Sequence, residues 1–386
     1  MRPVLVLILH PVAPAGAGAL VRALAEARRA LADEQRAAFL AAGADAAEVV
    51  AGPPDGLSFG ERLAAAVTEW TQGGRSGRPA GLSGGAAATS RGGLVILGSG
   101  SVPLATAADL RRFVEVAAGP GGHALANNRY SADVVAISRL SDLAGLPPLP
   151  ADNALPRWLQ ERAGVAVTDL GSHWRLGVDV DTPLDLIVLG DPAAPGLLAT
   201  APLIGERLAA LAEVLTNRRA ELLLAGRVSA TTLKWLERGV ACRVRALIEE
   251  RGLRAASRLA QAGATANRPP RSVLGELLDR DGSDALADTV ARMADAAVID
   301  TRVLIAHRAG SLEVAGPIQP GAGGPSAEDR FASDLLLPDG IADPWLRAVT
   351  ASAASAPSDH PIVLGGHTMI NGGLRLLAGR ARAGVR

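Results

Sequence analysis

Two aspartates separated by a single residue form the pattern in this sequence that most clearly suggests chemistry. Asp179 and Asp181 follow an apolar run that begins at Leu176, and alternation along an extended strand would place both carboxylates on one face. Thr182-Pro183 would end that strand and begin a helix, with Asp185 near the positive end of the helix dipole. Two carboxylates at a strand end suit a divalent metal ion, although they could also serve only to cap the helix.

The segment from Leu176 to Leu186, LGVDVDTPLDL, resembles the closing strand and helix of the GT-A-like nucleotidyltransferases. The resemblance is strongest to the molybdenum-cofactor and 2-phospholactate guanylyltransferases, and it covers residues 1–190, about half of the chain. In these enzymes a D-x-D-T-P-x-D-L ending holds the divalent metal that bridges the nucleotide phosphates. The resemblance therefore implies a GT-A-like fold, Asp179 and Asp181 as catalytic metal ligands, and Mg²⁺ or Mn²⁺ as the cofactor.

The family also has a phosphate-binding loop after its first strand. The equivalent loop here, His10 to Gly18, contains Gly16 and Gly18, and Arg22 lies one turn into the helix that follows. Glycines allow the backbone to approach phosphates, and a helix N-terminus attracts anions. However, two prolines remove backbone donors, and the arginine and lysine usual in the family are absent. The loop is therefore either a phosphate site or a plain connection between strand and helix.

A second metal aspartate is expected after the central strand, in a D-x-P context. The matching segment, Leu97 to Leu104 (LGSGSVPL), keeps the proline but has Ser101 at the aspartate position. A hydroxyl is a much weaker ligand for a hard cation than a carboxylate. Ser99 and Ser101 remain candidate nucleotide ligands, and the resemblance supports the fold more strongly than it supports catalysis.

Asn127, Asn128 and Asp133 lie between two expected strands, where similar enzymes hold the acceptor. An Asn pair there suits either ligand contacts or a tight turn. The resemblance implies an enzyme that moves a nucleoside monophosphate from an NTP, with GTP one candidate, to a small phosphorylated or acidic acceptor and releases pyrophosphate. The alternative hypothesis is a catalytically degenerate domain that serves as a binding or scaffold module, with any ligand chemistry in the C-terminal half.

Apolar runs that alternate with helical patterns predict the α/β class. Residues 1–197 are expected to form a GT-A-like domain with a mainly parallel sheet flanked by helices, and residues 198–386 a second, helix-rich α/β domain. The Pro- and Gly-rich segment 190–202 is the expected connector. A strand is expected at 176–181, and the Gly- and Ser-rich segment 73–93 is expected to be a surface loop.

The second half resembles no family that we recognise, but it carries polar residues near expected strand ends. Strands are expected at 295–306 and 361–364, and ligands bind at the carboxyl ends of parallel strands. The two histidines that follow these strands would form a shared metal or acid–base site only if the fold brings them together. The candidate residues of this second site are Arg227, Asp300, Arg302, His307, Gly366 and His367.

Composition limits the classes of protein that need consideration. The 386 residues suffice for two domains, and the balance of 39 basic and 39 acidic residues provides no net field to attract nucleic acid or an anionic membrane. The single cysteine, Cys242, excludes an intramolecular disulfide and a cysteine-based zinc site, which favours the cytoplasm. The apolar run at 4–9 is too short for a membrane span, so no membrane association is expected. The sequence is compatible with a homo-oligomer.

Overall fold

The computed structural model describes residues 2–52, 61–66, 92–147, 149, 154–249, 269–310 and 324–384. Within this part, the chain forms two compact units, and Asp179 is the last residue of the first. Ala17–Leu24 belongs to the second unit, whereas the residues before and after it belong to the first. The division thus falls between Asp179 and Val180 rather than after residue 197. Nearly all of the surface loop expected at 73–93 lies outside the described residues.

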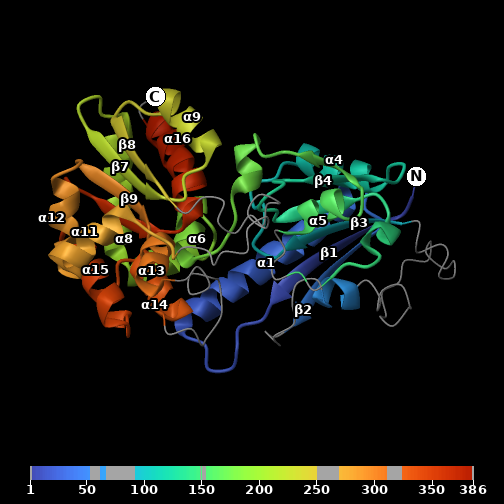
Figure 1. Cartoon of the computed structure of the whole chain (residues 1–386), viewed down its shortest axis with the longest axis horizontal. Helices are drawn as coiled ribbons and strands as arrows, with labels where there is room; N and C mark the ends of the chain where they lie inside the picture. Colours follow the sequence, from blue (N-terminus) through green and yellow to red (C-terminus); the bar gives the residue numbers. More distant parts are fainter. Residues whose placement is uncertain are drawn as a thin grey trace. The chain divides into compact units, whose positions relative to one another are not determined.

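The first unit is built on a six-stranded, mainly parallel sheet, as expected (Figure 1). The order of its strands is β2-β1-β3-β5-β4-β6, and β5 runs antiparallel to both of its neighbours. The remaining pairs are parallel. The strands are β1 (Val4–Pro11), β2 (Ala46–Gly52), β3 (Gly93–Gly98), β4 (His123–Ala126), β5 (Val134–Ile137) and β6 (Ala166–Asp169).

Both faces of this sheet are covered, which explains the unbroken apolar sequences of β1 and β3. Alternate residues of β1 point to opposite faces: Val6 and Ile8 join one buried cluster, and Leu5 and Leu7 join another. The first cluster includes side chains of α1 and α4, and the second includes α5 and the helical residues 61–66. These helices are α1 (Ala19–Ala41), α4 (Ala107–Ala117) and α5 (Leu155–Glu161).

The prediction of a strand at 176–181 is wrong. The chain instead forms a 3₁₀ turn, Trp174–Gly177, followed by a single antiparallel bridge between Asp179 and Ser101. A backbone carbonyl of that turn accepts a hydrogen bond of 2.7 Å from the side chain of Asn127. The side chain of Asn127 therefore satisfies a backbone carbonyl that would bond to a neighbouring strand in a sheet.

The helix expected after Thr182 is confirmed as α6 (Pro183–Leu189). The hydroxyl of Thr182 accepts from the backbone of Asp185, whose carboxylate accepts from the backbone of Thr182, so the two residues form a capping box. The segment 190–202, expected to be a connector, contains a helix that was not predicted, α7 (Ala194–Thr200). The proline of α7 occupies the first turn, where its missing N–H costs nothing.

The second unit is built on a four-stranded parallel sheet of order β10-β9-β7-β8. Figure 1 shows α9 and α16 to one side of this sheet and α11, α12 and α15 to the other. The strands are β7 (Glu221–Gly226), β8 (Arg243–Ile248), β9 (Ala296–Asp300) and β10 (Ile362–Gly365). The helices are α8 (Pro202–Thr216), α9 (Ala230–Gly239), α11 (Val273–Asp281), α12 (Leu286–Ala291), α13 (Thr301–Ala309), α14 (Ala327–Asp334), α15 (Pro344–Ser355) and α16 (Leu374–Gly384). None of the helices in the described part of the chain has both the length and the apolar character needed to cross a membrane.

The strand expected at 295–306 is also wrong, because β9 ends at Asp300 and α13 begins at the next residue. The carboxylate of Asp300 caps this helix by accepting from the backbone N–H of Arg302. The middle of α13 is buried, and a helix that is apolar on all sides lacks the periodicity that separates it from a strand.

Candidate functional site

The carboxyl edge of the first unit's sheet brings a histidine and a serine into contact. His10 lies near the end of β1 and Ser99 directly after β3, its parallel neighbour, and His10 Nδ1 is 3.0 Å from Ser99 Oγ. Burial lowers the pKa of His10, and the positive charges of Arg29 and Arg28 lower it further. The imidazole is therefore neutral at neutral pH. His10 was absent from the predicted site, although its place at the end of a buried strand was a usable signal.

Ser101 and Asp179, both predicted site residues, lie side by side at the same edge. They form the backbone bridge described above, and Ser101 Oγ accepts from the backbone N–H of Gly98 at 3.2 Å. The next residue, Val102, has φ 43°, a left-handed conformation that β-branched residues rarely adopt. Such backbone strain is concentrated at functional sites.

Gln35 of α1 supports this turn from the helical layer. Its side-chain nitrogen donates to the backbone carbonyl of Ser101, and the residue is buried. Its Oε1 atom has no hydrogen-bond partner among the residues that the structure describes.

The structure gives Asn127 a structural role. Its Nδ2 donates to the carboxylate of Asp133 at 2.8 Å and to the carbonyl of the 3₁₀ turn at 2.7 Å, and its Oδ1 accepts from the backbone of Asp133 and Val134 at 2.9 and 3.3 Å. These bonds fill all four positions of a side-chain amide, so none remains for an acceptor molecule. Asn128 accepts from the backbone N–H of Tyr130, as in the tight-turn alternative.

The predicted phosphate loop already binds a carboxylate of the protein itself. Glu328 of α14 accepts hydrogen bonds from the backbone of Leu20 at 3.0 Å and of Val21 at 3.1 Å, at the start of α1. A Cβ atom at Gly18 would lie 2.1 Å from the carboxyl carbon of Glu328, so the absence of a side chain at Gly18 permits this approach. The helix N-terminus attracts an anion, as predicted, but the anion is internal.

The other two residues of the predicted loop act locally. Gly16 supplies a turn with φ 80°, a conformation that glycine adopts without strain. Arg22 is exposed, and its guanidinium donates to the backbone carbonyl of Ala17. These features match the plain strand–helix connection that was the alternative for this loop.

The second unit has the topology of a ligand site between β7 and β9. The chain leaves β7 to form β8 on one side of it, then returns to place β9 on the other side. Where strand order reverses in this way, the helices that follow diverge and leave a crevice at the carboxyl ends of the strands. Arg227 directly follows β7, Asp300 ends β9, and His367 follows β10 by one residue.

Arg227 and Asp300 form a two-point ion pair at this edge. Nε and Nη2 of Arg227 lie 2.6 and 3.1 Å from the two carboxylate oxygens of Asp300. The Asp300 side chain is 0% exposed, whereas that of Arg227 is 32% exposed. Burial acts to raise the pKa of Asp300, but attraction and hydrogen bonding to Arg227, with attraction to Arg302, outweigh burial and lower it. A Cβ at Gly226 would lie 2.3 Å from that of Asp300, so glycine is needed here.

A second ion pair, between Arg302 and Asp334, lies behind the first. Nη1 and Nη2 of Arg302 are 3.2 and 3.1 Å from the carboxylate oxygens of Asp334. Burial is the largest influence on Asp334 and raises its pKa. Sequence reasoning missed Asp334 because it did not predict α14; the signal was the capping box that Ser326 and Asp329 form at the start of that helix.

Asn371 joins two of the loops at this edge, and it was also missed. Its Nδ2 donates to the carbonyls of Arg227 at 3.1 Å and His367 at 2.8 Å, while its Oδ1 accepts from the backbone of Ser229 at 2.8 Å and the hydroxyl of Thr232 at 2.9 Å. Asn371 belongs to a π-helical segment, Met369–Gly373, and such segments occur frequently at functional sites. The loops after β7 and β10 are therefore held together before any ligand binds.

The two histidines considered for a shared site in the second half have different surroundings. His307 lies in the last turn of α13 rather than at a strand end, with Nδ1 accepting from the backbone of Ser272 at 3.2 Å and Nε2 3.1 Å from Asp279. Both ring nitrogens are thus engaged in packing α13 against α11. Among the described residues, His307 joins no group of side chains arranged to share a metal ion.

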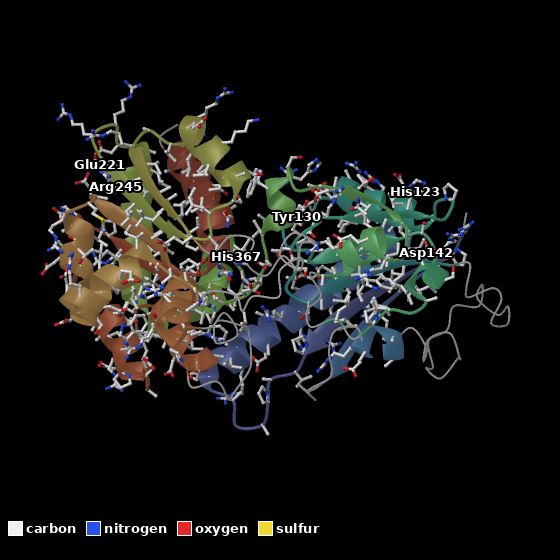
Figure 2. The ribbon with its side chains drawn as sticks, viewed as in Figure 1. His123, Tyr130, Asp142, Glu221, Arg245 and His367 are labelled. Atoms are coloured by element: carbon white, nitrogen blue, oxygen red, sulfur yellow. The ribbon has the colours of Figure 1, made fainter. Side chains whose placement is uncertain are left out.

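His367 instead lies near Asp181, the second aspartate of the sequence motif. A ring nitrogen of His367 and a carboxylate oxygen of Asp181 are within 4.8 Å of each other. The negative charge of Asp181 also acts to raise the pKa values of Arg227 and Arg302, so it lies close to both guanidinium groups. Figure 2 labels His367 among the side chains of the second unit. Of the six residues predicted for this half, five lie at one sheet edge, and His307 does not.

Comparison with known proteins gives this chain no relative: no family model, no curated protein and no solved structure matches it. The basis for a function is therefore the sequence motif and the geometry of the two sheet edges. Only Val180 separates Asp179 from Asp181 in the chain, and carboxylate oxygens are the donor type that suits a divalent cation.

Proposed function

We propose that the protein is a metal-dependent nucleotidyltransferase whose catalytic groups lie at the carboxyl edge of the first unit's sheet. It would transfer a nucleoside monophosphate from an NTP to a small phosphorylated or acidic acceptor and release pyrophosphate. The observation that carries this proposal is the bridge between Ser101 and Asp179, which places the motif aspartate beside the turn after β3. A mainly parallel sheet with covered faces supports it, because ligands bind at the carboxyl ends of such strands.

Each residue at this edge has a role that its chemistry supports. Asp179 and Asp181 would hold a divalent ion, which would supply positive charge to offset the charge that develops on the leaving pyrophosphate. Ser99 and Ser101, with the backbone of the turn between them, would contact the phosphates. The neutral imidazole of His10 accepts from or donates to Ser99 and so fixes that hydroxyl. Because Glu328 occupies the start of α1, we assign no phosphate contact to Gly16, Gly18 or Arg22.

Thermal unfolding of the intact protein with each of the four NTPs, with and without Mg²⁺ or Mn²⁺, tests this proposal. At about 100 times its dissociation constant, a ligand adds about 2.7 kcal/mol to the stability of the protein that binds it. We expect one NTP to stabilise the protein only when metal is present, and Asp179→Asn to abolish the effect.

The exposed aspartate Asp359 provides the matched control, because Asp359→Asn removes a carboxylate remote from this edge in sequence. That variant should keep the full metal-dependent shift. The proposal is wrong if no NTP stabilises the protein in the presence of either metal, or if Asp179→Asn is stabilised as strongly as the natural protein.

A second candidate function is a binding or scaffold module that has lost catalysis in its first unit. The observation that favours it is Glu328, whose carboxylate takes the place expected for nucleotide phosphates at the start of α1. This candidate predicts no metal-dependent shift with any NTP. Ligand chemistry would then belong to the edge of the second sheet, around Arg227 and Asp300.

A further inference from the structure

We propose that His367 is a metal ligand that acts together with Asp181, and that the ion is a transition metal such as Mn²⁺ or Zn²⁺ rather than Mg²⁺. The inference deepens the proposed function, because Asp181 is one of the two aspartates proposed for that reaction. The pairing of His367 with Asp181, however, rests on the geometry of the second unit alone.

The separation of the two side chains fits a shared ion. A ring nitrogen of His367 and an oxygen of Asp181 lie within 4.8 Å of each other, and both side chains are half-buried. Two ligands that each lie about 2.1 Å from one ion are separated by roughly 3 to 4 Å. Small side-chain rotations would therefore bring both atoms to coordination distance.

The backbone around His367 is fixed, and space is open next to it. Asn371 holds the carbonyl of His367 with a hydrogen bond of 2.8 Å and ties it to the carbonyl of Arg227. At Gly366, a Cβ atom would meet nothing within 4 Å. A side chain whose backbone is already held in place loses less conformational entropy when it binds a ligand, which favours affinity.

The charges at this edge favour the binding of a metal ion together with an anion. Asp300 and Asp334 are each occupied by two hydrogen bonds from an arginine, so they have little attraction left for a cation. Arg227 and Arg302 lie close enough to Asp181 to repel a bare metal ion. Two protein ligands leave open coordination positions, and a phosphate in one of them could also contact the partly exposed guanidinium of Arg227. Metal and phosphate should therefore bind cooperatively.

The ligand set selects the metal. Carboxylates alone suit Mg²⁺, which prefers oxygen ligands and keeps its waters. An imidazole nitrogen shifts the preference towards Mn²⁺, Zn²⁺ and other transition metals. If His367 is a ligand, the affinity for Mn²⁺ should fall strongly when the ring is removed, and the affinity for Mg²⁺ should change much less.

Mn²⁺ binding to the full chain, followed by electron paramagnetic resonance with and without inorganic phosphate or pyrophosphate, tests the proposal. In the natural protein we expect nitrogen coupling to bound Mn²⁺ and tighter Mn²⁺ binding when phosphate is present. His367→Ala should abolish the nitrogen coupling and weaken Mn²⁺ binding by at least tenfold. His123→Ala is the matched control, because His123 is exposed at the start of β4 in the first unit (Figure 2), and it should change neither property.

His367→Asp provides a second variant that keeps a ligand at this position. It should retain metal binding, lose the nitrogen coupling and shift the preference towards Mg²⁺, a pattern that simple unfolding would not produce. Persistent nitrogen coupling in His367→Ala, or unchanged metal affinity in both variants, would overturn the proposal. Nitrogen coupling that depends on His367 in a protein that binds no NTP would refute only the nucleotidyltransferase function.

Discussion

Two buried carboxylates, Asp300 and Asp334, show how single residues set the properties of the second sheet edge. Each is fully buried and accepts two hydrogen bonds from one arginine, yet the pKa of Asp300 is lowered and that of Asp334 is raised. Burial raises both values, but Asp300 attracts two arginines and His367, whereas Asp334 also experiences the negative charge of Asp300. Removing one partner of such a pair costs about 3–5 kcal/mol, since a buried charge is left uncompensated. We infer that these aspartates position the arginines rather than bind ligands.

His10 gives a testable prediction at this scale, because burial and the neighbouring Arg29 and Arg28 lower its pKa in the folded protein. A base whose pKa falls below its value of 6.5 in the unfolded chain binds protons more readily when unfolded. Its contribution to stability is therefore complete above pH 6.5 and is lost as the pH falls from 6.5 towards the lowered pKa. The free energy of unfolding should decrease over this interval in the natural protein.

His10→Asn should reduce that decrease, because an asparagine nitrogen can take the place of Nδ1 beside Ser99 but does not titrate. Urea unfolding at pH 7 and pH 5 measures the difference for both proteins. A matched substitution of the exposed His123 should leave the slope unchanged. An equal loss of stability in His10→Asn and the natural protein would show that other groups cause the pH dependence.

At the scale of elements, the start of α1 depends on a residue that is distant in the sequence. Glu328 of α14 accepts hydrogen bonds from the backbone of Leu20 and Val21, which are 308 and 307 residues away. A distant segment of the same chain therefore caps α1. A carboxylate at a helix N-terminus is favoured both by hydrogen bonds and by the helix dipole. Glu328→Ala should therefore destabilise the second unit by about 1–2 kcal/mol.

Glu328→Gln separates the two contributions, because it keeps a hydrogen-bond acceptor and removes the charge. Its loss of stability should be smaller than that of Glu328→Ala and should depend less on salt. Urea unfolding at low and high ionic strength measures both effects. If Glu328→Ala were as stable as the natural protein, the contact with Leu20 and Val21 would not act as a cap.

Elements whose structure depends on nearby residues could be predicted from the sequence. The buried strands β1 and β3 and the capped starts of α4 and α6 follow from local patterns, and the capped start of α6 was predicted. The errors arose where a distant contact decides the conformation. The turn at the start of residues 176–181 accepts a hydrogen bond from the distant Asn127, and the cap at the start of α1 comes from Glu328. Of the six residues proposed for the second half, five lie at one sheet edge. Their partners Asp334 and Asn371 were not foreseen, because the capping box that begins α14 was overlooked and the π-helical segment has no comparable sequence pattern.

At the scale of the whole molecule, the path of the chain differs from two domains joined in series. Ala17–Leu24 belongs to the second unit, and α1 therefore contributes its first residues to one unit and the rest to the other. Leu20, in this segment, packs against the buried cluster formed by Ile305, Ala332, Ile341 and Leu346. The second unit also begins at Val180 and so includes α6. Cutting the chain at different points should therefore have predictable effects.

Two fragments of the second half test separately how α6 and the segment Ala17–Leu24 contribute to its stability. A fragment of residues 198–386 lacks α6, whose Leu184, Ile187 and Val188 are buried in the intact protein. Since each buried aliphatic side chain contributes about 1.5–3 kcal/mol, the loss approaches the whole stability of an ordinary domain, and we expect no cooperative unfolding. A fragment of residues 180–386 keeps α6 and lacks Ala17–Leu24, so it should fold but unfold at lower urea concentration than the second unit of the intact chain. Circular dichroism during urea titration compares the two, and equal cooperative stability of both fragments would show that α6 is not part of the folding unit.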